Sequence, residues 1–333
     1  MTNHKIAGFD LPHAHTQDKL HRVLSSALES RLGKVIRVGA GEQGSRGATR
    51  QSGKFFSLSG CPLVPLSSYW DAKHFGLNRV KIFREACVEE QIEILQLCNL
   101  GLLEEAYFIE QAGVGYMAKM VTLAETTEER MLYALFSGDE VTHLAQISQF
   151  IDTSELVGTD DPFLRLLGDL VENPDKSVLL FILQVVLEGW GLSHYRSLAK
   201  DCHSSDLSAV LWGFLQDESR HHSTGVTLFD RVAVTKSSQQ TMIETLALFL
   251  QMVQVGPQSV VAAIEKVKGY LSPAQKVKIF EELDTEIHSG TRLQLLRSLM
   301  RSPNAEVIVE ELEVRGAFQP FPANKCVFSG VSS

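Results

Sequence analysis

The sequence is poor in the cysteine patterns that mark disulfide-linked or zinc-binding domains. Its five cysteines are widely spaced and form no Cys-x-x-Cys pair. This spacing argues against a zinc ribbon, a rubredoxin-like iron site and a disulfide scaffold. Reduced thiols are typical of the cytoplasm, so we expect a cytoplasmic protein.

Positive charge and long apolar runs are also scarce. The chain has 31 Lys and Arg against 40 Asp and Glu, a net charge of −9, which gives no sign of a nucleic-acid partner. No apolar run of signal-peptide length follows the N-terminus. The most apolar stretch, residues 178–192, is interrupted by Gln184 and Glu188 and falls short of a membrane span. We therefore expect a soluble protein that binds neither nucleic acid nor a membrane.

Helical periodicity dominates the rest of the chain. Apolar residues recur at steps of three and four, which predicts an almost wholly α-helical protein. The main predicted helices cover residues 16–32, 78–123, 126–150, 163–171, 176–200, 207–229, 239–255 and 273–300, with a short helix near Tyr270. Residues 39–60, rich in Gly, Ser and Arg, are predicted to form a loop or flap. Residues 307–309 fit either a strand or a helix end.

The segment Asp-Glu-x-x-His occurs twice, at residues 139–143 and 217–221. Thirty residues before each motif glutamate, a lone glutamate lies on an apolar stretch. The two halves form a cryptic repeat with an offset of 78 residues. Glu110, Gly113, Asp139, Glu140 and His143 in the first half correspond to Glu188, Gly191, Asp217, Glu218 and His221 in the second.

This doubled pattern predicts a dinuclear metal centre. On a helix, Glu and His three residues apart lie on one face and can bind one ion. Two lone glutamates plus two such pairs are the ligand set of carboxylate-bridged metal centres in four-helix bundles. The predicted ligands are Glu110, Glu140, His143, Glu188, Glu218 and His221, with Glu140 and Glu218 as bridges. Asp139 and Asp217 are candidate partners for the second ring nitrogen of the histidine in the opposite motif.

Several alternatives stay open at this point. A solvated charged face would also contain Glu-x-x-His pairs, although the doubling and the equal spacings favour metal. Glu105 is the main alternative to Glu110 as a ligand. Asp284 and His288, one turn apart on a late helix, are further residues that could reach the site. His222 is expected beside the ligands or on the surface.

Three more residues are predicted to border the centre. Gly113 and Gly191 each follow a lone glutamate by three residues, and a glycine inside a helix costs about 1 kcal/mol relative to alanine. Either they leave room beside the metals for O₂ and substrate, or they allow close helix packing. Tyr195, seven residues after Glu188, either borders the site or belongs to the core.

Over about residues 80–231 the pattern resembles the ferritin-like superfamily, specifically its non-heme di-iron carboxylate oxidases and oxygenases. The resemblance implies a ferritin-like four-helix bundle with additional N- and C-terminal helices. We expect residues 1–77 to form an N-terminal helix and a Gly/Ser-rich loop that pack on the bundle. Residues 78–231 would form the di-metal bundle, and residues 232–333 a helical extension of the same domain.

The resemblance also implies a function. Two iron ions, Fe²⁺/Fe³⁺, with manganese as the alternative, would activate O₂ as in a monooxygenase or oxidase. The substrate would be a small organic molecule that undergoes C–H hydroxylation, desaturation or N-oxygenation. A ferredoxin or reductase would supply electrons, and a homodimer is expected. The alternatives are a ferroxidase that handles iron and a non-enzymatic helical protein with a vestigial motif.

Departures from the pattern set some relatives aside. Rubrerythrins append a Cys-x-x-Cys domain that is absent here. The small subunit of ribonucleotide reductase has a radical tyrosine where this chain has Ile147. The p-aminobenzoate N-oxygenases have a seventh ligand, a histidine, where this chain has Phe214.

Overall fold

The computed structural model describes Val23, residues 69–153, Leu156 and residues 161–328. These residues form helices and contain no strand, which confirms the predicted all-α class. The predicted loop at 39–60 lies outside the described residues. So does the predicted helix at 16–32, apart from Val23, which is helical.

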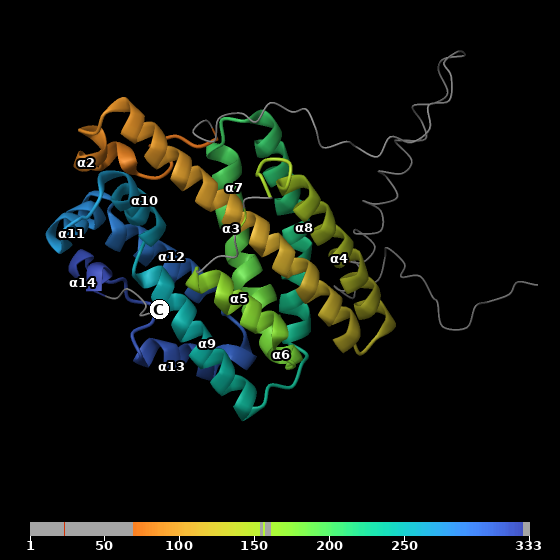
Figure 1. Ribbon diagram of the computed structural model, residues 1–333. Coiled ribbons are helices and arrows are strands. Elements are labelled where there is room, and N and C mark those ends of the chain that lie inside the picture. The colour runs from red at the N-terminus through yellow and green to blue at the C-terminus, as the bar shows by residue number, and fades with distance from the viewer. Residues whose placement is uncertain (1–22, 24–68, 154–155, 157–160, 329–333) are drawn as a thin grey trace, which may run out of the picture.

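Four long helices form a bundle (Figure 1). They are α3 (Val88–Leu123), α4 (Thr127–Ile147), the continuous helix Lys176–Asp201, and α8 (Ser205–Phe229). The third of these consists of α6 (Lys176–Leu179), the π-helical segment η3 (Leu180–Leu187) and α7 (Glu188–Asp201). α3 packs on α4, α7 packs on α8, and both η3 and α4 also contact α8.

Side-chain caps begin two of these helices where the sequence predicts a start. Thr126 accepts a hydrogen bond from the amide of Glu129, and Ser204 accepts one from the amide of Leu207. An oxygen at this position bonds an amide that has no partner inside the helix. These caps fix where the two helices that bear the Asp-Glu-x-x-His motifs begin.

The connection between the two halves of the bundle carries its own helix, α5 (Pro162–Glu172). It matches the short helix predicted for residues 163–171. α5 packs against α3 and against the later helix α9, so the chain crosses the bundle before it enters α6. The crossover lets α3 and α4 pair with each other and lets α7 pair with α8.

Further helices precede and follow the bundle along the chain. Before it come η2 (Leu77–Arg79) and α2 (Lys81–Arg84); after it come α9 (Lys236–Gln254), α10 (Gln258–Lys268), α11 (Pro273–Glu282), α12 (Thr285–Leu299), η4 (Pro303–Ala305), α13 (Glu306–Val314) and α14 (Ala323–Phe328). The additional C-terminal helices expected with the fold are therefore present, and residues 307–309 are helical. Figure 1 shows α10, α11 and α14 beside the α2 end of α3.

Three predicted helices differ from the structure. The helix predicted for 78–123 breaks before α3 begins at Val88. The helix predicted for 273–300 is two helices, because Asp284 adopts a left-handed conformation with φ 48° between α11 and α12. The short helix predicted near Tyr270 is α10, which ends at Lys268, and Tyr270 itself is exposed.

The apolar stretch at 178–192 is part of a core helix. The whole helix Lys176–Asp201 is long and apolar enough to cross a membrane by length and composition, so its length does not exclude a span. However, 67% of its most apolar window is buried in the protein, as in the core helix of a soluble protein. Among the described residues, α9 and α10 pass the same test only as a bent pair.

Candidate metal centre

Six sequence-predicted side chains meet inside the bundle. α3 and α7 contribute one glutamate each, and α4 and α8 contribute a glutamate and a histidine each. They form two groups, and within each group the candidate ligand atoms lie within 4.8 Å of one another. The first group is Glu110, Glu140, His143 and Glu218, and the second is Glu188, Glu218 and His221. Glu218 belongs to both groups, as a dinuclear centre requires.

The two motif glutamates lie between the two imidazoles. Glu218 places Oε1 3.4 Å from Nδ1 of His143 and Oε2 3.6 Å from Nδ1 of His221. Glu140 does the same, with Oε2 4.0 Å from His143 Nδ1 and Oε1 3.1 Å from His221 Nδ1. Each carboxylate thus directs one oxygen to each half of the site, which is the arrangement expected of a bridging ligand.

The outer nitrogen of each imidazole faces an aspartate of the opposite motif. Nε2 of His143 lies 3.1 Å from Oδ2 of Asp217, and Nε2 of His221 lies 3.5 Å from Oδ2 of Asp139. A carboxylate at this position holds the ring orientation and the tautomer in which Nδ1 is the free donor to a metal. Arg220 joins the two sides, because it ion-pairs with Asp217 and lies 4.0 Å from Asp139.

Tyr195 is a buried core residue that contacts a candidate ligand. Its hydroxyl donates a hydrogen bond to Oε1 of Glu110, while Oε2 of the same carboxylate lies 3.1 Å from His143 Nδ1. Phe214 packs between them, stacked on His143 at 4.2 Å and edge-on to Tyr195 at 5.5 Å. Phe136 covers His221 in the same way, with ring centroids 4.3 Å apart. These aromatic rings cover one side of each imidazole.

The buried charges of the site strongly influence one another. Burial and the neighbouring Glu218 raise the pKa of Glu140 to about 8. Burial alone would raise the pKa of Glu218, but His221 and His143 lower it to about 2. Burial works against the charged form of His143, yet Glu110 and Glu218 raise its pKa to about 10. Burial also raises the pKa of Glu188 well above its usual value.

The donor set fits two divalent cations. Four carboxylates balance the charge of two such ions, and buried carboxylates without counter-charges are costly. Both ring nitrogens of His221 and Oε2 of Glu188 are buried atoms without a hydrogen-bond partner. Buried polar atoms rarely stay unpaired, so a metal ion bound by His221 and Glu188 would supply a missing partner. Carboxylates with one imidazole per ion suit iron or manganese.

The two glycines differ in what surrounds them. A Cβ at Gly113 would lie 2.4 Å from Oε2 of Glu140, so this glycine makes room for a candidate ligand. A Cβ at Gly191 would meet nothing within 4 Å, so Gly191 borders open space. The close approach of Glu140 therefore explains Gly113, whereas nothing around Gly191 requires a glycine.

The remaining sequence candidates lie elsewhere. Glu105 is absent from both groups, and burial with the nearby Asp161 raises its pKa to about 7. Asp284 and His288 both contact Arg79 instead of the candidate ligands.

Sequence reasoning missed a polar layer next to the site. Gln184 is fully buried in η3, and its Oε1 accepts hydrogen bonds from the hydroxyls of Tyr116 at 2.9 Å and Tyr133 at 2.7 Å. Its Nε2 donates to the backbone oxygen of His221 at 2.8 Å. The available signal was Gln184, which together with Glu188 interrupts the apolar run at 178–192.

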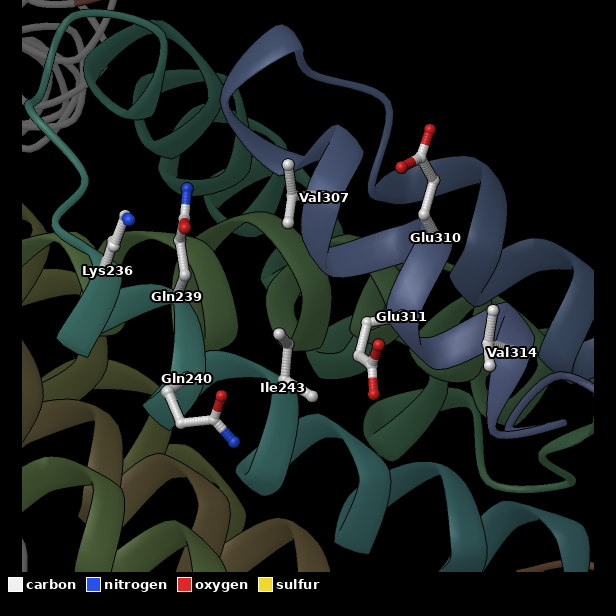
Figure 2. Close-up of a pocket in the computed structure, with 8 residues that line it drawn as sticks. All are labelled: Lys236, Gln239, Gln240, Ile243, Val307, Glu310, Glu311 and Val314. Atoms are coloured by element: carbon white, nitrogen blue, oxygen red, sulfur yellow. The ribbon is translucent and has the colours of Figure 1, made fainter.

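A groove of about 580 Å³ lies on the surface between α9 and α13 (Figure 2). Its lining residues are Lys236, Gln239, Gln240, Ile243, Val307, Glu310, Glu311 and Val314. None of the predicted site residues lines this groove. It is therefore separate from the candidate metal centre.

Comparison with known families agrees with this geometry. Residues 90–230 match a family model described as a ferritin-like domain, and all six candidate ligands lie in the matched range. The match confirms the resemblance to the ferritin-like superfamily over these residues, whereas the narrower resemblance to di-iron oxidases and oxygenases stays a prediction. The match lies inside residues 78–231, although the three predicted segments stay a prediction. The chain matches no curated protein and no solved structure, so no subfamily is identified.

Proposed function

We propose that this protein is an O₂-activating di-iron oxidoreductase that acts on a small organic molecule. The observation that carries the proposal is the pair of ligand groups that share Glu218. When bound, the two iron ions would supply the redox chemistry toward O₂. The particular reaction, whether hydroxylation, desaturation or N-oxygenation, stays open within this proposal.

The candidate ligands would have different roles in binding the two ions. Glu110 and Glu188 would be terminal ligands, and Glu140 and Glu218 would bridge, because each directs one oxygen to each imidazole. Tyr195 would keep one oxygen of Glu110 turned away from the metal by donating a hydrogen bond to it. The rigid outer contacts would hold the ligands in place before metal binds.

The surroundings of Glu188 support an organic substrate. Five of the six candidate ligands are buried, whereas Glu188 is half-buried. Gly191, one turn further along α7, borders open space. O₂ and substrate would therefore approach the second ligand group, on the α7 side of the bundle.

The proposal also includes the partners expected from the resemblance. Each turnover that inserts one oxygen atom needs two electrons, so a ferredoxin or reductase would supply them unless the substrate does. A homodimer and a cytoplasmic location stay predictions.

Anaerobic titration with Fe²⁺ tests the metal centre first. We expect about two ions per wild-type chain, as in other bundles with this ligand set. Glu218→Ala should remove both sites, and Glu244→Ala, at an exposed position of α9, is the matched control that should bind normally. Fewer than two ions in the wild-type chain would sink the dinuclear proposal.

Oxygen consumption tests the reaction. The di-iron protein is mixed with O₂, a chemical reductant and a panel of small acids, amines and aldehydes. We expect at least one compound to raise O₂ consumption and to yield an oxygenated or desaturated product. Consumption that yields only ferric iron, whichever compound is present, would favour the ferroxidase instead.

A further inference from the structure

The π-helical segment η3 ends directly before the candidate ligand Glu188. In an α-helix the amide of Glu188 would bond the carbonyl of Gln184, four residues back. Here it bonds the carbonyl of Leu183, five residues back. The register change leaves the Gln184 carbonyl without that partner. A π-helical segment of eight residues is rare inside an α-helix, so the side chains that hold it in place are of interest.

The imidazole of His222 takes the place of the missing amide. Its Nδ1 lies 3.2 Å from the backbone oxygen of Gln184. Since a carbonyl only accepts hydrogen bonds, Nδ1 carries the proton and donates. His222 lies on α8, next to the candidate ligand His221, so this bond ties the π segment to the helix that holds the second motif.

Gly189 makes the approach of His222 feasible. A Cβ at this position would lie 2.9 Å from Nδ1 and 2.8 Å from Cε1 of His222. The residue after the candidate ligand Glu188 must therefore be small for the imidazole to reach the Gln184 carbonyl.

The side chain of Gln184 also forms hydrogen bonds to other helices. Its amide donates to the His221 carbonyl, and its oxygen accepts from two tyrosines of α3 and α4. Gly225 on α8 packs directly on it, because a Cβ there would lie 2.6 Å from Cγ of Gln184. Residue 184 is thus bonded to three other helices.

We propose that His222 and Gln184 lock the π-helical turn, and that this lock presents the Glu188 carboxylate to the second metal site. His222 is then a positioning residue of that site. Without the lock, the segment can return to α-helical bonding. That return would turn Glu188 relative to residues 177–183 by about one residue, or roughly 100°. The effect on metal rests on the proposed metal centre, whereas the lock itself does not.

Amide hydrogen exchange of the metal-free full chain tests the lock directly. In His222→Ala we expect the amides of residues 183–189 to exchange about tenfold faster, since a lost hydrogen bond changes local stability by this order. His222→Asn should restore slow exchange, because Asn Nδ2 takes the position of His Nδ1. Ser223→Ala is the matched control: its hydroxyl bonds only the Arg220 carbonyl of its own helix, and exchange should not change.

Metal titration of the same variants tests the effect on the site. We expect the second ion to bind on the order of tenfold more weakly to His222→Ala, the first ion to bind normally, and His222→Asn to recover most of the loss. Exchange in His222→Ala equal to wild type would overturn the lock. Faster exchange with unchanged binding of both ions would overturn the positioning role. A wild-type chain that binds fewer than two ions would overturn the metal centre, and the exchange result would still decide the lock.

Discussion

The imidazole of His143 lies 3.1 Å from the carboxylate of Asp217, the residue before the shared glutamate of the other motif. His221 and Asp139 repeat the contact in the opposite direction at 3.5 Å. The aspartate of each motif therefore contacts Nε2 of the histidine in the other motif. The two halves of the repeat are coupled through their histidines as well as through their bridging carboxylates.

This crossed contact predicts the effect of removing either aspartate charge. Asp217→Asn should weaken metal binding at the His143 half by about 10- to 100-fold, the usual effect of losing such a partner. Asp139→Asn should do the same at the His221 half, with a smaller effect because its contact is longer. Competition with a chelator measures both affinities. Equal affinities in wild type and Asp217→Asn would contradict the assigned role.

The sharing of Glu218 predicts a difference between ligand variants. Glu110→Ala should remove the first ion only and Glu188→Ala the second only, because each belongs to one group. Glu218→Ala should remove both. Native mass spectrometry of the iron-loaded chains gives the stoichiometry. Loss of a single ion from Glu218→Ala would exclude the shared carboxylate.

The ligand set could be predicted because it depends on local periodicity. Glu and His three apart share a helix face in any α-helix, and the equal spacing of the two halves indicates a repeat. The crossed partners, Asp139 and Asp217, followed from the same repeat. These inferences need only the helices and their order, and the structure brings the side chains together as the repeat predicts, whereas their roles as ligands and partners stay predictions.

What the sequence did not reveal depends on contacts between helices. Residues 180–187 contain neither glycine nor proline, so nothing local marks the π-helical turn. The reason for the turn lies in another helix: His222 of α8 contacts the Gln184 carbonyl, and Gly189 leaves room for its ring. The break at Asp284 was also missed. A residue other than glycine is uncommon in the left-handed region, so nothing in the sequence indicated a break there.

The surroundings of the two glycines predict opposite effects of adding a methyl group. Gly113→Ala should displace Glu140, whose Oε2 would lie 2.4 Å from the new Cβ, and should weaken metal binding. Gly191→Ala meets nothing within 4 Å and is the matched control. It should bind metal normally and gain up to about 1 kcal/mol in free energy of unfolding from helix propensity. Metal titration and thermal unfolding of both variants test this pair, and similar affinities would show that Glu140 has room to move.

The pKa values of the site predict that metal binding strengthens as pH rises. The pKa of His143 is raised to about 10 and that of Glu140 to about 8, so both groups hold protons at neutral pH. A metal ion must displace these protons, because it binds the unprotonated ligands. Affinity should rise steeply up to about pH 8, where Glu140 loses its proton, and more gently above it, where His143 still releases one.

Calorimetry in two buffers of different ionisation enthalpy measures the protons released on binding. We expect at least two per chain near pH 7, because Glu188 and His221, whose pKa values are also raised, add to the protons released by Glu140 and His143, and fewer above pH 8. Glu140→Gln has no carboxyl proton to release. This variant should bind metal more weakly, and its affinity should rise less steeply with pH below about pH 8. A wild-type affinity that stays constant from about pH 6 to 8 would mean that these groups bind no protons that a metal must displace.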